Sequence, residues 1–398
     1  MKQISLASAG LPSTKAFTLA DRTVRVLHLN AGNLYGGVET LLTTIARLRH
    51  LCPRMESHFA ACYEGRWTQE LAEAGAPVYL LGPARISRPW TVWRARRHLR
   101  ELLLKDRFDV VICHMAWSLK VFGPAARAAG HKVIFWAHGQ PATPTWLDRV
   151  ASRVIPELAI ANSGFTAGLL SSQRPNIPVR VLYYPVALTE MPRRDQWRLA
   201  VRREQEVSED TTVILQVSRL EAWKGQLLHL RALAKLKHRP DWVCWIVGGQ
   251  QTAAEAQYLE ELKRTAEQLE IGGRVRFLGQ RSDVHKLLSA SDIFCQPNQG
   301  PEPFGIVFIE ALWAGVPVVS TAIGGAREIV DESCGCLVEP DDIGSLAESL
   351  ARLIESRELR RRLGSAGPSR ARQLCDPAQQ MKALDDIVRQ TNGSAADR

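Results

Sequence analysis

The chain has 398 residues, of which 45% are hydrophobic and 23% are charged. This length is too great for one ordinary core, so we expect two domains, and the composition excludes a disordered chain. No apolar run reaches the ~18 residues of a membrane-spanning helix, and residues 1–20 lack the apolar core of a signal peptide. We therefore expect a cytoplasmic protein, with peripheral attachment to the inner face of the membrane as an option.

The positive charge of the chain lies in its first half. Residues 1–190 hold 23 Lys and Arg against 12 Asp and Glu, a net charge of +11. The remaining residues hold 28 against 29, a net charge of −1. This asymmetry predicts an anionic partner for the first half, such as a membrane surface, a phospholipid or an acidic glycan.

Strand-like and helical segments alternate through the predicted first domain, residues 21–187, after an expected flexible tail at 1–20. The predicted strands are 24–29, 58–62, 78–80, 110–113, 133–137 and 158–161. The predicted helices are 38–48, 91–104, 119–129 and 163–170. Nearly continuous apolar strands joined by helices predict a parallel sheet that is covered on both faces.

The predicted second domain, residues 208–376, repeats this alternation after a charged linker at 188–207. Its predicted strands are 213–217, 243–247, 275–278, 293–295, 318–320 and 335–338. Its predicted helices are 225–237, 254–270, 283–289, 306–314 and 343–355, with a closing helical segment within 377–398. The fold class is therefore α/β, with two Rossmann-like domains.

Eight cysteines are present, and several lie in apolar strand-like runs, as is typical of reduced, buried cysteine. Cys334 and Cys336 form the one close pair, but no further Cys or His follows at the spacing of metal ligands. We expect core packing and no metal site.

Two loops of the first half carry candidate binding residues. Gly36 and Gly37 follow the first strand and open a helix, so their backbone can approach a ligand and present N–H groups. His138 and Gly139 end the strand 133–137, and ligands of open parallel sheets bind beyond the carboxyl ends of strands. A hydrogen-bonded structural histidine is the alternative, but this location favours a binding role for His138.

Arg219 and Lys224 follow the first strand of the second half, in the stretch Arg-Leu-Glu-Ala-Trp-Lys-Gly. An Arg fork and a compact Lys charge at the carboxyl end of a strand can neutralise a diphosphate. Cations at this place would stabilise the charge of a diphosphate that departs as a bond breaks. A surface helix start with ordinary basic residues is the alternative for this stretch taken alone.

The most informative segment begins with Glu302-Pro-Phe-Gly-Ile and continues to Glu310. Phe304, Gly305 and Ile306 open a predicted helix, whose free N–H groups and dipole form an anion site. Glu310 lies about 7.5 Å further along the axis, and helical side chains lean back toward the N-terminus. The segment thus predicts a diphosphate site with a carboxylate on each side, which suits a nucleotide-sugar.

These motifs together resemble the signature of retaining GT-B glycosyltransferases of the family-4 type. Two glutamates separated by seven residues, the first before Pro-Phe-Gly, the second before Ala-Leu, are followed by Ala-Gly-Val-Pro-Val-Val. The resemblance implies a first domain that binds the acceptor and a second domain that binds a UDP- or GDP-sugar. It also implies that 377–398 crosses back to the first domain, and that a glycan or a lipid-linked molecule is the acceptor.

The resemblance also assigns roles to residues. Glu302 would bind hydroxyls of the donor sugar and Glu310 the ribose, while His138 would contact the donor sugar as a positioning group. The Gly36–Gly37 loop would border the donor phosphate, and the loop backbone near Gly279 would select the base. No metal or other cofactor would be required, because Arg219, Lys224 and the amides of residues 304–306 supply the positive field. Tyr183-Tyr184-Pro185-Val186 departs from the Asn-Gly-Val that is frequent in this family.

The segment Arg85–Arg107 is rich in Arg and also contains Trp90 and Trp93. Arg and Trp on an amphipathic helix are typical of a membrane-surface helix, which here would face anionic lipid. Stripes of this kind usually serve cores, so we favour a helix that covers the sheet with its Trp and Leu packed inward and its Arg facing water, and we keep the membrane-surface helix as a hypothesis.

Other functions remain open at this level. A nucleotide-sugar epimerase of the same fold is one alternative, and a nucleic-acid-binding protein is another because of the basic first half. We expect no nucleic acid, since the predicted phosphate site lies in the near-neutral half. A phosphorylase would need a cofactor-lysine motif that we do not find, and a dehydrogenase is disfavoured by the missing G-x-G-x-x-G fingerprint.

Overall fold

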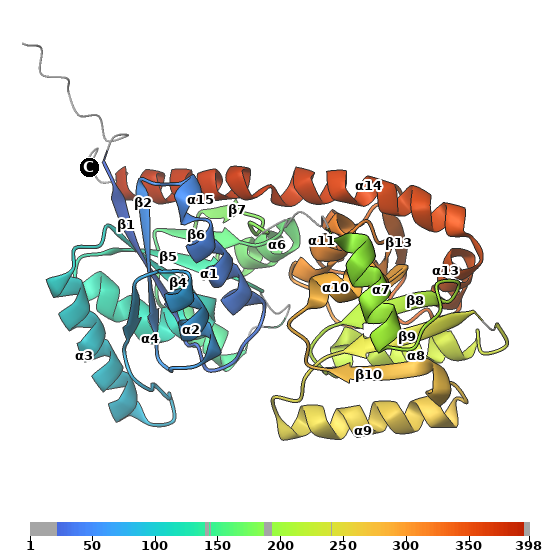
Figure 1. Ribbon diagram of the computed structural model, residues 1–398. Helices are drawn as coiled ribbons and strands as arrows, with labels where there is room; N and C mark the ends of the chain where they lie inside the picture. Colours follow the sequence, from blue (N-terminus) through green and yellow to red (C-terminus); the bar gives the residue numbers. More distant parts are fainter. Residues whose placement is uncertain (1–21, 140–142, 144, 187–192, 240, 394–398) are drawn as a thin grey trace, which may run out of the picture.

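The computed structural model describes residues 22–139, 143, 145–186, 193–239 and 241–393. Two parallel sheets, each covered by helices on both faces, lie side by side (Figure 1). The architecture is GT-B, with two Rossmann-like domains, as the sequence predicts. The predicted tail at 1–20 lies outside the described residues.

The first sheet has seven strands in the order β3-β2-β1-β4-β5-β6-β7. Its strands are β1 (Val24–Asn30), β2 (Met55–Ala61), β3 (Val78–Leu80), β4 (Val110–His114), β5 (Lys132–Ala137), β6 (Leu158–Ala161) and β7 (Val179–Val181). Its helices are α1 (Gly37–Arg47), η2 (Arg49–Leu51), α2 (Arg66–Glu73), α3 (Pro89–Lys105), α4 (Met115–Ala128), α5 (Trp146–Ala151) and α6 (Gly164–Gln173). The strand order reverses between β1 and β4, which is where Rossmann-like sheets place their ligands.

The second sheet has six strands in the order β10-β9-β8-β11-β12-β13. Its strands are β8 (Thr212–Val217), β9 (Trp242–Val247), β10 (Val275–Gly279), β11 (Ile293–Gln296), β12 (Val318–Thr321) and β13 (Gly335–Val338). The helices that precede or join them are α7 (Arg194–Glu204), η3 (Ala222–Lys224), α8 (Gln226–Ala234), α9 (Ala253–Gln268), η4 (Gly272–Arg274), α10 (Val284–Ala290), α11 (Ile306–Trp313), α12 (Ala326–Ile329) and α13 (Ile343–Glu355). The reversal here falls between β8 and β11.

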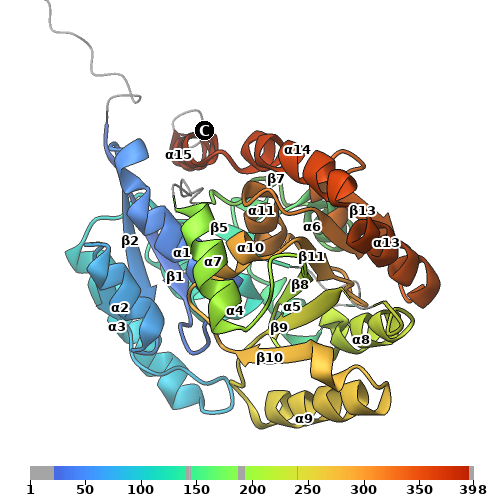
Figure 2. The same ribbon diagram turned by 45° about the vertical axis from the view of Figure 1, so that its right-hand side comes forward.

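Two long helices close the chain, α14 (Arg357–Cys375) and α15 (Pro377–Gly393). They follow one side of the molecule, α14 over the second domain and α15 over the first (Figures 1 and 2). α15 lies against β1, β4 and η2, and Arg389 donates to the carbonyl oxygens of Arg22 and Arg54 at 2.9 and 3.1 Å. The final helix therefore packs on the first domain.

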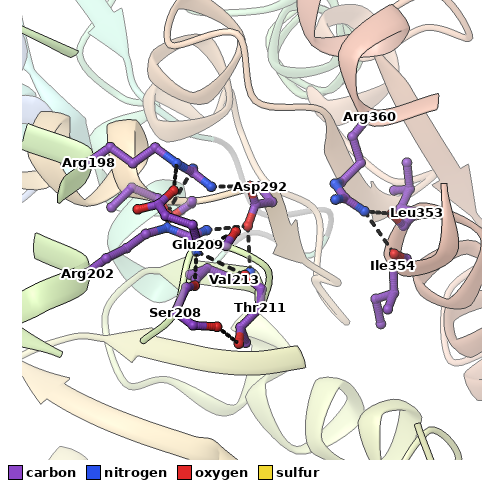
Figure 3. A network of polar contacts seen from close by, with 12 residues as sticks. Arg198, Arg202, Ser208, Glu209, Thr211, Val213, Asp292, Leu353, Ile354 and Arg360 are labelled. Carbon is purple, nitrogen blue, oxygen red and sulfur yellow. Dashed lines mark hydrogen bonds and ion pairs between the residues drawn. The ribbon is translucent and has the colours of Figure 1, made fainter. Parts of the chain in front are cut away.

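Helix α7 occupies much of the stretch that the sequence suggests as a linker. It packs on α10 of the second domain, and its Arg202 is only 1% exposed. Figure 3 shows Arg198 and Arg202 converging on Asp292, with Arg202 at 2.6 Å from that carboxylate. Arg202 also donates to the carbonyl oxygens of Ala290, Ser208 and Thr211. The charged side chains Arg198 and Arg202 thus bind α7 to the second domain, and α7 is not a solvent-exposed linker.

Replacing Arg202 should destabilise the second domain, because removal of one partner leaves the carboxylate of Asp292 and several carbonyls without their cation. We expect Arg202→Met to lower the free energy of unfolding by about 3 kcal/mol, measured by urea denaturation. Arg203→Met is the matched control, since Arg203 is exposed on the same helix. Equal loss in both variants would contradict the structural role of this ion pair.

Candidate active site

The carboxyl ends of the two sheets meet at the domain boundary, and the predicted site residues gather there. A Cβ placed on Gly37 would lie 3.7 Å from Cδ1 of Ile306, and one on Gly139 would lie 2.8 Å from Cγ of Pro303. The loops that follow β1 and β5 in the first domain therefore lie directly against the turn that opens α11 in the second. Residues more than 150 positions apart in the sequence are brought together as predicted.

Glu302 lies at the centre of this site and is 8% exposed. Its Oε2 accepts hydrogen bonds from Lys224 Nζ at 2.5 Å, Gln296 Nε2 at 3.3 Å and Asn298 Nδ2 at 3.5 Å. All three donors follow strands of the second sheet or end one. Within the described part of the chain, Oε1 has no protein partner, so this oxygen is the one open to a ligand hydroxyl.

Lys224 ends the short helix η3, and its Nζ also lies 3.9 Å from the ring centroid of Trp223. The ion pair with Glu302 fixes the ammonium group beside the α11 turn, where the sequence places the diphosphate. Arg219 lies in the same loop but is paired with Glu221 at 3.0 Å and with Glu255 at 3.2 Å. Its side chain is 40% exposed, so an anionic ligand would compete with these two carboxylates for the guanidinium group.

Gly305 shapes the turn that opens α11. Its φ of +98° is a backbone conformation that side chains disfavour, and a Cβ there would lie 2.5 Å from the ring of Phe308. Helix α11 begins at Ile306, so the first free N–H groups belong to residues 305–307. Among the described residues no protein acceptor faces these groups, and the predicted anion site remains available.

The side chain of Phe304 has a different role from its backbone. It is 2% exposed and packs against Tyr183 and Tyr184, with ring centroids 5.7 and 5.0 Å away. Phe304 therefore seals the boundary between the domains and does not line an open pocket. Gly279 ends β10 in a left-handed conformation with φ of +65°, and no atom lies within 4 Å of its added Cβ, which leaves open space for a ligand.

His138 belongs to a buried hydrogen-bonded chain of rings. Its Nδ1 lies 2.6 Å from the Tyr184 hydroxyl and its Nε2 lies 2.7 Å from His114 Nδ1. His114 Nε2 in turn lies 3.0 Å from His28 Nδ1. Burial lowers the pKa of His28 and of His138 to about 3, and that of His114 well below its usual range, so all three rings are neutral.

This chain limits what His138 can do. Both of its ring nitrogens already have partners in the first domain, so a ring contact with a donor sugar would have to replace one of these bonds. Asn162 Nδ2 donates to the His138 carbonyl at 2.9 Å and to the Tyr184 hydroxyl at 3.2 Å. The sequence did not predict Tyr184 or Asn162 as part of the site, although Asn162 directly follows β6 and Tyr184 comes three residues after the end of β7.

Glu39 is a further acidic group near the boundary. Its carboxylate accepts from the backbone N–H of Gly36 at 2.9 Å and from Asn30 Nδ2 at 2.8 Å, which fixes the Gly36–Gly37 loop. Burial raises the pKa of Glu39, while these hydrogen bonds and the charge of Arg219 oppose the shift. Glu39, which follows the Gly36–Gly37 loop in the sequence, thus fixes the conformation of that loop.

Glu310 lies just over one turn into α11, partly shielded from solvent. Burial raises the pKa of its carboxyl from 4.5 to about 7. None of the residues in the described ranges makes a hydrogen bond to this carboxyl, so no protein donor offsets its burial. A polar ligand group such as a diol would supply the missing partner.

Comparisons with known proteins agree with this geometry. The family model of glycosyl transferases group 1 matches residues 198–370, and the model of glycosyltransferase family 4 matches residues 35–190. The chain belongs to the GT-B glycosyltransferases of the family-4 type. The Glu302–Glu310 segment and the Arg219–Lys224 loop both lie within the residues that the first of these models matches.

Similar proteins include the D-inositol 3-phosphate glycosyltransferase of Corynebacterium jeikeium, 36% identical over 43% of this chain and 42% of that protein. A GDP-mannose-dependent phosphatidylinositol monomannoside mannosyltransferase of Corynebacterium glutamicum is 33% identical over 44% of this chain and 46% of that protein. The matches thus span less than half the length of these two relatives. The crystal structure of Anabaena HepE with UDP-glucose is 25% identical, with a TM-score of 0.79 over 92% of this chain and 99% of HepE.

The sequence also bears on metal binding, membrane spanning and the packing of α3. Among the described residues no group of His, Cys, Asp and Glu is placed to hold a metal ion, and no helix there is long and apolar enough to cross a membrane. Helix α3 packs through Ala95, Leu99 and Leu103. The prediction that leucines of this helix pack inward is thus confirmed, but the prediction that its tryptophans do so is wrong, because Trp90 is 65% and Trp93 63% exposed.

The raised pKa of Glu310 makes a testable prediction about stability. The folded protein binds this proton more tightly than the unfolded chain, so stability is lost as the pH rises from about 5 through 7. Glu310→Gln cannot ionise, and its melting temperature should fall less than that of wild type across this range. Glu348→Gln, on the exposed face of α13, is the control. If the melting temperatures of wild type and Glu310→Gln fell equally between pH 5 and 7, the raised pKa of Glu310 would be contradicted.

Proposed function

We propose that the protein is a retaining glycosyltransferase that transfers a sugar from a UDP- or GDP-sugar to a glycan or lipid-linked acceptor. The observation that carries this proposal is the site at the opening of α11. There, the Lys224 ammonium converges at the boundary between the domains with backbone N–H groups and with Oε1 of Glu302, none of which has a partner among the described residues. Those groups match a diphosphate with a sugar attached at one end.

The chemistry of this site is positioning and charge stabilisation. Lys224 and the N-terminus of α11 would stabilise the diphosphate as the glycosidic bond breaks. Glu302 would bind sugar hydroxyls through Oε1, and Glu310 would accept hydrogen bonds from the ribose. The departing diphosphate would help to deprotonate the acceptor hydroxyl on the same face, so the anomeric configuration would be retained. The residues present supply the positive field without a metal ion.

The similar proteins support a role in the synthesis of glycolipids or of polysaccharides. One relative is named for GDP-mannose and a phosphatidylinositol acceptor, another for an inositol phosphate, and the HepE structure contains UDP-glucose. Those names suggest both bases as candidates for this chain. A panel of UDP- and GDP-sugars, followed by thermal shift, would select between them, since ligand at 100 times its Kd stabilises by about 2.7 kcal/mol.

Two substitutions should separate binding from turnover. We expect Glu310→Ala to weaken nucleotide binding about tenfold or more, because it removes charged hydrogen bonds to the ribose. Lys224→Ala should lower kcat about a hundredfold with a smaller effect on the nucleotide Kd, because its charge acts on the leaving group. Lys235→Ala, exposed at the end of α8, is the control. If both variants retained wild-type binding and turnover, these roles would be wrong.

We also propose an anionic membrane surface as a partner of α3. Its exposed face presents Trp90, Trp93, Arg94, Arg97 and Arg100, the combination of aromatic and basic groups that favours a lipid interface. Arg96 is not part of this face, since it donates to the carbonyl oxygens of Lys120 and Val121 and ties α3 to α4. An acceptor carried by a lipid would be presented to the first domain by this surface.

Removal of the three exposed arginines should therefore reduce lipid binding without unfolding the protein. We expect Arg94→Gln/Arg97→Gln/Arg100→Gln to sediment less with vesicles that contain phosphatidylserine, and wild type to lose binding as salt rises. Vesicles of phosphatidylcholine alone are the control. Equal sedimentation of both proteins with anionic vesicles would refute a membrane role for α3.

A further inference from the structure

Glu328 of α12 accepts several hydrogen bonds across the boundary between the domains. Its Oε2 accepts from the backbone N–H of Gly164 at 2.8 Å and its Oε1 from that of Phe165 at 2.8 Å. The hydroxyl of Tyr183 donates to Oε2 at 3.0 Å. All three donors belong to the first domain, whereas Glu328 belongs to the second. One carboxylate therefore spans the boundary.

The position of the Glu328 carboxylate at the start of α6 strengthens its hydrogen bonds. The two N–H groups are the first of α6, where the helix dipole favours a negative charge, and hydrogen bonds to an ionised carboxylate are stronger than neutral ones. Ser163 caps the same helix by accepting from Thr166 N at 3.0 Å. Burial, with the bond to Glu328, raises the pKa of Tyr183 to about 12, so its hydroxyl keeps its proton at ordinary pH.

Glu328 is also joined to the candidate active site. The N–H of Gly325, at the start of α12, donates to the carbonyl oxygen of Glu302 at 2.7 Å. From the other side, Arg370 of α14 donates to the carbonyl oxygen of Glu328 at 2.6 Å and holds α12 in place. The segment that carries Glu328 is thus fastened to the backbone of the residue that would bind the donor sugar.

The hydrogen bonds of Glu328 lie where they can break and form again as the domains separate and close. Gly164 is exposed and Glu328 keeps some contact with solvent, so water can replace the donors when the domains separate. The ring of Tyr183 stacks on Phe304 of the α11 turn, while its hydroxyl is bound to Glu328. Separation of the domains would therefore break the carboxylate contact and uncover the turn in a single movement.

We infer that Glu328 is a latch that holds the two domains closed and sets the position of the 302–306 turn. It is a positioning residue: both of its carboxylate oxygens are bound by groups of the first domain, and it acts through α6, Tyr183 and the backbone of Glu302. The effect on turnover depends on the proposed glycosyl transfer, but the effect on domain closure does not.

The test begins with the shape of the protein. Glu328→Gln keeps the size of the side chain but turns an amide NH₂ toward the donors of α6 or Tyr183. We expect a larger radius of gyration than wild type by small-angle X-ray scattering, with a melting curve that stays cooperative. Glu332→Gln, an exposed carboxylate four residues further on, is the matched control and should scatter like wild type.

Tyr183→Phe provides a second variant in case Glu328→Gln fails to fold. It keeps the ring that stacks on Phe304 and loses only the hydroxyl, so its radius of gyration should lie between those of wild type and Glu328→Gln. If every variant that folds scatters like wild type, the latch is refuted. An increase in Glu332→Gln equal to that in Glu328→Gln would also refute it.

Kinetics then test the positioning role. With the sugar nucleotide that wild type turns over, Glu328→Gln should lower kcat about tenfold, while the Kd of UDP or GDP changes less than about threefold, because the charged groups proposed to bind the nucleotide, Lys224 and Glu310, belong to the second domain and do not contact Glu328. Glu328→Asp should restore part of kcat, since it keeps the charge. Unchanged kcat would refute the positioning role. Absence of turnover by wild type with every UDP- and GDP-sugar would refute the proposed function but leave the scattering result in force.

Discussion

Parallel strands direct all of their carboxyl ends to one edge of a sheet, and this constraint determines where the site can form. In each domain the strand order reverses once, between β1 and β4 and between β8 and β11. A crevice that can hold a ligand forms beside such a reversal, outside the carboxyl ends of the strands. The two edges face each other, so the glycine loop after β1 and the His138 loop after β5 meet the turn of α11. The site is shared by two domains because neither edge is complete alone.

Phe304 of the second domain packs against two tyrosines of the first, and this contact forms the apolar part of the interface between the domains. A buried aromatic ring at a domain boundary stabilises the closed arrangement through its apolar area and its ring contacts. The polar groups around it are satisfied on each side separately: Glu302 by Lys224 in the second domain, and His138 by Tyr184 and His114 in the first. The domains therefore meet through an aromatic contact, and the polar bonds that cross the boundary include those of Glu328 and the one from Gln251 Nε2 to the carbonyl oxygen of Tyr35 at 3.4 Å.

The sequence predicted the fold and most of the site because both depend on local patterns. Apolar runs of strand length located six strands in each half, and strand 78–80 and helix 343–355 agree with the structure to the residue. β7 escaped prediction because its pattern is short and half exposed. α14 contains Gly364, Gly367 and Pro368, which suggest breaks. The structure explains Gly367, since a Cβ there would lie 2.4 Å from the carbonyl oxygen of Leu312, so close packing on α11 demands glycine.

The partners of the predicted site residues could not be predicted in the same way. The ion pair of Lys224 with Glu302, the two carboxylates on Arg219 and the histidine chain join residues from different loops, and only the tertiary fold decides which loops meet. A sequence pattern shows that a charge is present at a strand end. It does not show whether that charge is already neutralised, as it is for Arg219, or free, as it is for one oxygen of Glu302.

The path of the last helix has a consequence for the order of events during synthesis. Because α15 packs on β1, β4 and η2, part of the surface of the first domain stays uncovered until the entire second domain has left the ribosome. The first domain can collapse early, but it lacks its final covering helix for most of the time that translation requires. Chaperones that recognise exposed apolar surface would encounter the nascent chain at that helix-binding face, and a ribosome stalled before residue 377 would release a first domain with its core open on that side.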